Sequence, residues 1–117
     1  MKSCVTISLV SSLKGGPWIL WDDLEQSLAT ASELGFDGVE LFTADATIDS
    51  PKSLSDLLAE YNLDLAAVGT GAGKVLNGLT LTSPDPEIRK KSISFIKDMM
   101  IFGADHGAPT ILGSMQG

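Results

Sequence analysis

Short apolar stretches alternate with amphipathic stretches along most of the chain. The apolar stretches are rich in β-branched residues and have the length of strands; they cover residues 4–10, 38–42, 63–68 and 109–113. Between them, apolar residues recur at the three- and four-residue spacing of helices that bury one side. Repeated strand–helix units with apolar strands predict an α/β fold with a parallel sheet and right-handed crossovers.

Cap residues predict where three helices begin. Asp22 and Glu25 have the spacing of a capping box, and the pairs Ser50-Pro51 and Asp85-Pro86 each place a cap residue before a proline. The expected buried sides are Leu24, Leu28, Ala31 and Leu34 for the first helix, Leu54, Leu57, Leu58 and Tyr61 for the second, and Ile88, Phe95, Ile96, Met99 and Phe102 for the third. Residues 69–84 show no helical pattern, and we expect a long flexible loop there.

The three helix-to-strand junctions share one shape. A residue suited to the left-handed conformation ends each helix, namely Gly35, Asn62 or Gly107, and the next strand begins within about three residues. This pattern alone leaves two closures of the sheet open, a doubly wound sheet and a (β/α)8 TIM barrel, which needs about 250 residues. Only residues 114–117 follow the fourth predicted strand, so we expect an interrupted barrel. Residues 1–117 would then form the N-terminal half of one TIM-barrel domain, with about four strands and three helices.

Composition narrows the possible partners. The net charge of -7 disfavours nucleic acid, and the one cationic run, residues 89–91, falls inside a helical pattern and is expected to be a solvated helix face. No stretch approaches the ~18 uncharged apolar residues of a membrane span. Cys4 is the only cysteine and is expected to be a small buried hydrophobe, which fits a reducing, cytoplasmic location.

Two motifs that suggest chemistry have plainer explanations. The glycine-rich residues 69–74 fail the register of a phosphate-binding loop, because Val68 and Val75 occupy positions that need Gly and Ser or Thr. Glycines here, including Gly71, would instead let the backbone approach a substrate at the barrel mouth. His106 is the only histidine and falls in the last turn of the third helix, where a cation complements the helix dipole.

Several polar and aromatic residues are expected at the carboxyl ends of the strands, where barrel enzymes bind substrates. Glu40 is a carboxylate in an otherwise apolar strand, and either contact with a substrate or a structural hydrogen-bonding role explains it. Trp18 and Trp21 follow the first strand, where an indole can stack on a sugar or pack over the barrel top. Hydroxyl and amide groups that suit a polyol follow the later strands; they belong to Thr70, Ser114 and Gln116.

Two segments resemble a known family. Residues 33–41, with the sequence ELGFDGVEL, resemble the first helix-to-strand junction of the xylose isomerase-like TIM-barrel superfamily. Residues 81–89, the helix up to Phe102, and residues 107–111 resemble the segment before the fourth strand in its sugar phosphate isomerase/epimerase branch. The net charge of -7 and the single histidine speak against its endonuclease branch.

The resemblance implies a metal-dependent isomerase or epimerase of carbohydrate metabolism. Family members hold a divalent metal (manganese, magnesium or cobalt) with Glu, Asp and His residues of later strands, and move a proton or hydride beside a sugar carbonyl. This chain does not contain those positions, so it provides no catalytic or metal residue, and we expect the chain alone to bind no metal and to be inactive. By position, the resemblance implies that the substrate site is lined by Glu40, the loop after Val68, Ser114 and Gln116.

Two functions of different classes follow. The first is part of a sugar or sugar phosphate isomerase/epimerase; the second is a self-contained α/β binding module without catalytic activity. If the sheet is half of a barrel, its first and last strands are open edges, and we expect self-association through them.

Overall fold

The computed structural model describes residues 1–15, 20–21 and 23–117. The predictions for Trp18, as a substrate-lining residue, and for Asp22, as a helix cap, lie outside these residues.

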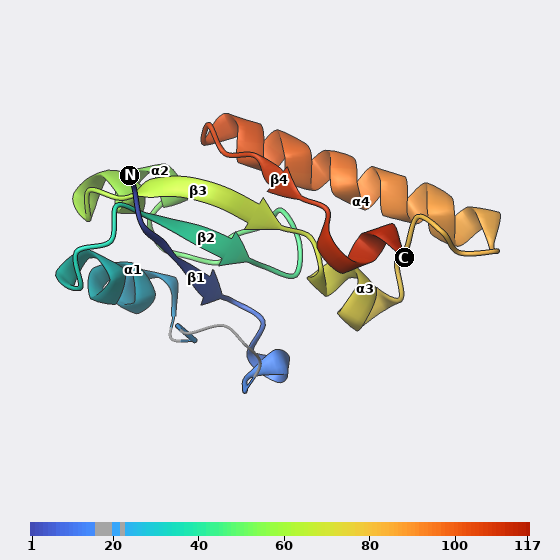
Figure 1. Ribbon diagram of the computed structural model, residues 1–117, viewed down its shortest axis with the longest axis horizontal. Coiled ribbons are helices and arrows are strands. Elements are labelled where there is room, and N and C mark those ends of the chain that lie inside the picture. Colours follow the sequence, from blue (N-terminus) through green and yellow to red (C-terminus); the bar gives the residue numbers. More distant parts are fainter. Residues whose placement is uncertain (16–19, 22) are drawn as a thin grey trace.

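The structure is a parallel sheet with helices, as the sequence predicted. Its strands are β1 (Cys4–Ser8), β2 (Gly38–Phe42), β3 (Asp64–Gly69) and β4 (Thr110–Ile111), in the order β1-β2-β3-β4. The helices are α1 (Leu24–Glu33), α2 (Leu54–Glu60), α3 (Ala72–Asn77) and α4 (Pro86–Asp105), with short 3-10 turns η1 (Ser11–Leu13) and η2 (Gly113–Gln116). The strand arrowheads point toward the side where α3 and the C-terminus lie (Figure 1).

The strand order distinguishes the TIM barrel from the doubly wound sheet, the two arrangements that the sequence pattern allowed. A doubly wound sheet reverses its strand order at a switch point and carries helices on both faces. Here the order follows the sequence from β1 to β4 without reversal. Alternate strand residues form one core with residues of α1, α2 and α4: Val5, Ile7, Val39, Leu41, Leu65 and Val68 on the strands, and Leu24, Leu28, Leu54, Leu57, Leu58 and Met99 on the helices. This is the arrangement of part of a TIM barrel.

The other sheet face corresponds to the inside of a barrel. It carries the intervening residues Thr6 of β1, Glu40 of β2 and Ala67 of β3, all half-buried. Thr6 is paired in register with Glu40, and Glu40 with Ala67 across an irregularity between Val39 and Glu40. The polar side chains of Thr6 and Glu40 therefore project from this face.

The helix ends follow the expected chemistry more closely than the helix starts. Gly35, Asn62 and Gly107 all have positive φ values, of 83°, 53° and 69°, which confirms their role as terminators. Asp85 caps α4 and accepts a hydrogen bond from the Glu87 amide at 2.9 Å, also as predicted.

Two helix starts differ from the prediction. The cap of α1 is Asp23, which accepts from the Gln26 amide at 2.9 Å. Ser50 and Pro51 do not begin α2; its cap is Ser53, whose hydroxyl accepts from the Asp56 amide at 3.1 Å. Several cap-forming residues lie close together at both places, and tertiary packing selects among them.

Two burial predictions were wrong. Cys4 is exposed, because it begins an edge strand on the face that the helices leave open. Leu34 is 67% exposed, because α1 has ended at Glu33 and the chain turns away from the core.

The prediction of a long loop after β3 was also wrong, since this segment contains the helix α3. Ala72 and Gly73 of this helix are buried. A Cβ on Gly73 would lie 2.7 Å from a ring carbon of Phe95 and 3.0 Å from the Met115 sulfur. These glycine-rich residues therefore allow a short helix to pack closely between α4 and η2.

The edges of the sheet are β1 and β4, as expected for an open half-barrel. The two edges differ. The Ser8 amide donates to the Leu20 carbonyl at 2.9 Å, and Ile7 forms a parallel bridge with Leu20. Leu20 thus covers part of the outer edge of β1.

None of the helices in the described ranges is long and apolar enough to cross a membrane.

Candidate substrate-binding mouth

Glu40 is the central residue of β2 and lies on the sheet face away from the helix-packed core. No hydrogen bond or ion pair joins its carboxylate to the residues that the structure describes. Burial raises the pKa of this carboxyl above its ordinary value. A half-buried carboxylate without a protein partner can accept hydrogen bonds from the hydroxyl groups of a ligand.

Glycine on the neighbouring strand leaves room beside this carboxylate. A Cβ on Gly69 would lie 3.7 Å from the Glu40 Oε1 and 3.4 Å from a ring carbon of Phe42. Phe42 is buried and packs with Val10 and Ala72 in a second, smaller apolar cluster at this end of the sheet. Glu40 therefore lies near the apolar ring of Phe42 and near the backbone of Gly69, which carries no side chain.

Gly71 brings the end of β3 close to η2. A Cβ at Gly71 would lie 3.2 Å from both a Phe42 ring carbon and the Ser114 Oγ. The structure thus brings together Glu40, Gly71 and Ser114 around Phe42, which the sequence analysis had not included. Phe42 reads as an ordinary core residue, and only its position at a strand end indicates otherwise.

The remaining candidates have different surroundings. Thr70 is fully buried, and its hydroxyl lies within hydrogen-bonding distance of the carbonyls of Ile111 and Leu112, at 3.1 and 2.8 Å. Its side chain therefore ties β3 to the end of β4. Gln116 is exposed in η2.

A cleft lies beside this mouth, above the ends of β1 and β2. Its volume is about 410 Å³, and its lining includes Ser8, Trp21, Asp23, Thr43, Asp45 and Asp49. Carboxylates, hydroxyls and an indole together suit a polyhydroxylated ligand. Trp21 was predicted from sequence to lie near the mouth, whereas Thr43 and Asp45 were not; the signal that indicates them is the polar stretch directly after β2.

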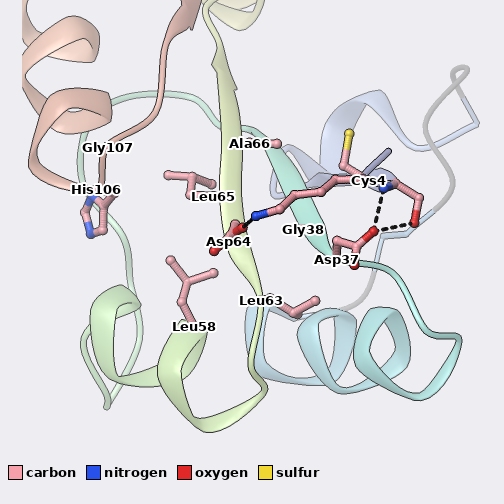
Figure 2. A pocket seen from close by; sticks show the side chains of 12 residues that line it. Cys4, Asp37, Gly38, Leu58, Leu63, Asp64, Leu65, Ala66, His106 and Gly107 are labelled. Atoms are coloured by element: carbon pink, nitrogen blue, oxygen red, sulfur yellow. Dashed lines mark hydrogen bonds and ion pairs between the residues drawn. The ribbon is translucent and has the colours of Figure 1, made fainter.

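A second hollow of about 420 Å³ lies at the opposite, N-terminal ends of the strands. Cys4, Asp37, Asp64 and His106 surround it (Figure 2). Asp64 pairs with the Lys2 ammonium at 2.8 Å, Asp37 accepts from the Ser3 amide at 2.7 Å, and the His106 Nδ1 lies 2.9 Å from the Phe102 carbonyl. Asp64, Asp37 and His106 therefore already have partners within the chain, and the hollow lies away from the carboxyl ends where barrels bind substrates.

The residues within the described ranges include no group of three or more His, Cys, Asp or Glu side chains that could hold a metal ion. The divalent metal implied by the family resemblance therefore does not fit a site built from these residues alone.

Comparison with known proteins identifies a family. The sequence model of the xylose isomerase-like TIM barrel matches residues 28–117. This match begins within α1 and includes Glu40, Gly71, Ser114 and Gln116. A search of curated proteins finds no match.

Proposed function

We propose, since the chain belongs to the xylose isomerase-like TIM-barrel family, that it forms the N-terminal half of a sugar isomerase or epimerase domain. Its part in the reaction is to form one wall of the mouth that binds the sugar or sugar phosphate. The reaction class is proton or hydride transfer next to a carbonyl.

The observation that carries this proposal is the environment of Glu40. Its carboxylate lies beside Gly69 at the carboxyl end of β3, the side where barrels bind substrates, it is free of protein partners in the described part of the chain, and burial raises its pKa. A structural carboxylate in this position would be expected to have hydrogen-bond partners. We assign it to binding a sugar hydroxyl, with the Ser114 hydroxyl and the Gly71 backbone nearby.

The catalytic groups belong to parts of the domain outside this chain. We expect the full-length protein to hold manganese, magnesium or cobalt on those parts, and the 117-residue chain to be inactive alone. Trp18 and Gln116 remain predicted members of the lining, and Thr70 would support it from behind, since its side chain is fully buried and its hydroxyl donates to backbone carbonyls. We also propose that the protein is cytoplasmic.

Replacing Glu40 in the full-length protein tests the assignment. Loss of a charged hydrogen bond, worth about 1.5–3 kcal/mol, lowers kcat/KM for the sugar roughly 10- to 100-fold in Glu40→Gln. The matched control is Glu33→Gln, which makes the same chemical change at an exposed site at the end of α1 and leaves kcat/KM unchanged. Unchanged turnover together with a large loss of stability in Glu40→Gln would assign the residue to structure.

A further inference from the structure

The cleft of about 410 Å³ above the ends of β1 and β2 has an acidic lining. Asp23, Asp45 and Asp49 contribute carboxylates, and no lysine or arginine of the described ranges belongs to the lining. Within the part of the chain that the structure describes, none of these three carboxylates forms an ion pair. An anion bound in this cleft would therefore lie beside like charges without a counterion.

The lysines of the surrounding segments do not supply a counterion. Lys14, Lys52 and Lys74 follow β1, β2 and β3 along the chain, and none of them lines the cleft. Lys52 pairs with Glu25 at 3.1 Å and with Glu60 at 3.0 Å, and Lys74 donates to the carbonyl of the last residue at 2.9 Å. A phosphate group carries roughly two negative charges at neutral pH, and proteins usually bind it with Arg, Lys or free backbone amides.

A carboxylate also occupies the helix end that faces this cleft. Asp23 and Leu24, at the N-terminus of α1, both belong to the lining. Helix N-termini often bind phosphate, because their amides and the helix dipole attract anions. Here the Asp23 carboxylate accepts from the Gln26 amide at 2.9 Å. The chain thus fills with its own negative charge the position in which a helix attracts phosphate.

Neutral hydroxyl groups suit the same lining. Ser8 is 1% exposed; its Oγ accepts from the Val10 amide at 3.3 Å, and in the described ranges its hydroxyl donates to no acceptor. This hydroxyl hydrogen is available to an oxygen of a ligand, and the carboxylates of Asp45 and Asp49 can accept from the hydroxyls of a ligand. The indole of Trp21 adds a surface on which a sugar ring can stack.

We propose that this cleft selects an unphosphorylated sugar, an inference that rests on the proposed isomerase or epimerase function. The cleft binds an end of an aldose or ketose that carries hydroxyls and no phosphate. Asp23, Asp45 and Asp49 are the residues that determine this specificity, because they accept hydrogen bonds from the sugar and repel the phosphate of a sugar phosphate.

Calorimetry with the full-length protein tests this inference, with a panel of free aldoses and ketoses and their terminal phosphate esters as ligands. The best-bound free sugar has a dissociation constant about tenfold or more below those of its phosphates. In Asp49→Lys a cation replaces a carboxylate of the cleft, and this preference falls about tenfold. Asp49 forms no hydrogen bond or ion pair in the described ranges, so the change breaks no contact there. Asp56→Lys is the matched control, since Asp56 is exposed on α2 outside the cleft, and it leaves the preference unchanged.

Tighter binding of sugar phosphates by the wild type, equal effects of the two variants, or no binding of any free sugar overturns the inference. Turnover of the same panel is measured separately. Selective binding of free sugars without conversion supports the selectivity of the cleft and contradicts the proposed isomerase or epimerase function. Conversion of sugar phosphates in preference to free sugars supports that function and overturns the selectivity.

Discussion

The raised pKa of Glu40 makes the free energy of unfolding depend on pH. Burial raises the pKa of its carboxyl above the ordinary 4.5, because the charged form loses solvation. Between the ordinary pKa and the raised one, the folded chain binds more protons than the unfolded chain. The free energy of unfolding therefore falls as pH rises through this window, and the contribution of Glu40 to stability is fully present only below the ordinary pKa.

Glu40→Gln removes this ionisation and its unfavourable effect. We expect the melting temperature of the variant to equal or exceed that of the wild type near pH 7, and the difference to shrink toward about pH 4. Thermal denaturation followed by circular dichroism across this range measures it, with Glu33→Gln as the reference. A variant that is less stable than the wild type at neutral pH would reveal a stabilising contact of the carboxylate.

At the level of single residues, the sequence shows which residues are unusual for their element better than it shows which way their side chains point. Glu40 was recognisable because a carboxylate is unusual in an apolar strand. The exposure of Cys4 was not, because the face on which the first residue of an edge strand lies depends on what covers that face. The Thr70 hydroxyl turns to the carbonyls that end β4, which only the assembled sheet determines.

At the level of elements, the contact between α4 and β4 depends on one glycine. Gly103 is buried, and a Cβ there would lie 2.7 Å from the Ala108 carbonyl oxygen and 3.2 Å from the Thr110 Oγ1. A backbone atom cannot move aside as easily as a flexible side chain. The helix therefore needs glycine at this position to approach the strand that follows it.

Gly103→Ala should destabilise the fold for this reason. Overpacking costs about 1–3 kcal/mol, and the better helix propensity of alanine offsets up to about 1 kcal/mol of it. We expect a net loss of about 1–2 kcal/mol, measured by urea denaturation. Gly73→Ala is the comparison, since the atoms it would meet belong to the side chains of Phe95 and Met115. Equal stability of Gly103→Ala and wild type would contradict the close packing of α4 on β4.

Elements whose ends depend on local chemistry were predictable. β2 has the predicted bounds, and Gly35, Asn62 and Gly107 end their helices because left-handed residues act within one turn. The six-residue α3 was missed, because so short a helix shows no periodic apolar side and forms through packing against Phe95 and Met115. The start of α2 was misplaced because Ser50 and Ser53 are both suitable caps, and packing of Leu54 favours the second.

At the scale of the whole molecule, the chain is an open parallel sheet with one helix-covered face and one face that carries Glu40. The pattern predicted the strands and their direction, and the family resemblance supplied the barrel. Sequential strand order then distinguished the barrel from a doubly wound sheet. The open edges β1 and β4 lead to the same expectation of self-association as the sequence did.

Proton NMR of sugars in deuterated water, with the full-length protein and manganese, magnesium or cobalt, tests the central claim most directly. The account predicts that at least one sugar or sugar phosphate is converted to its isomer or epimer. Deuterium at the carbon next to the carbonyl would identify proton transfer, and product without deuterium would identify hydride transfer. A panel of aldoses, ketoses and their phosphates that stays unchanged with all these metals would contradict the account and favour a binding module without catalytic activity.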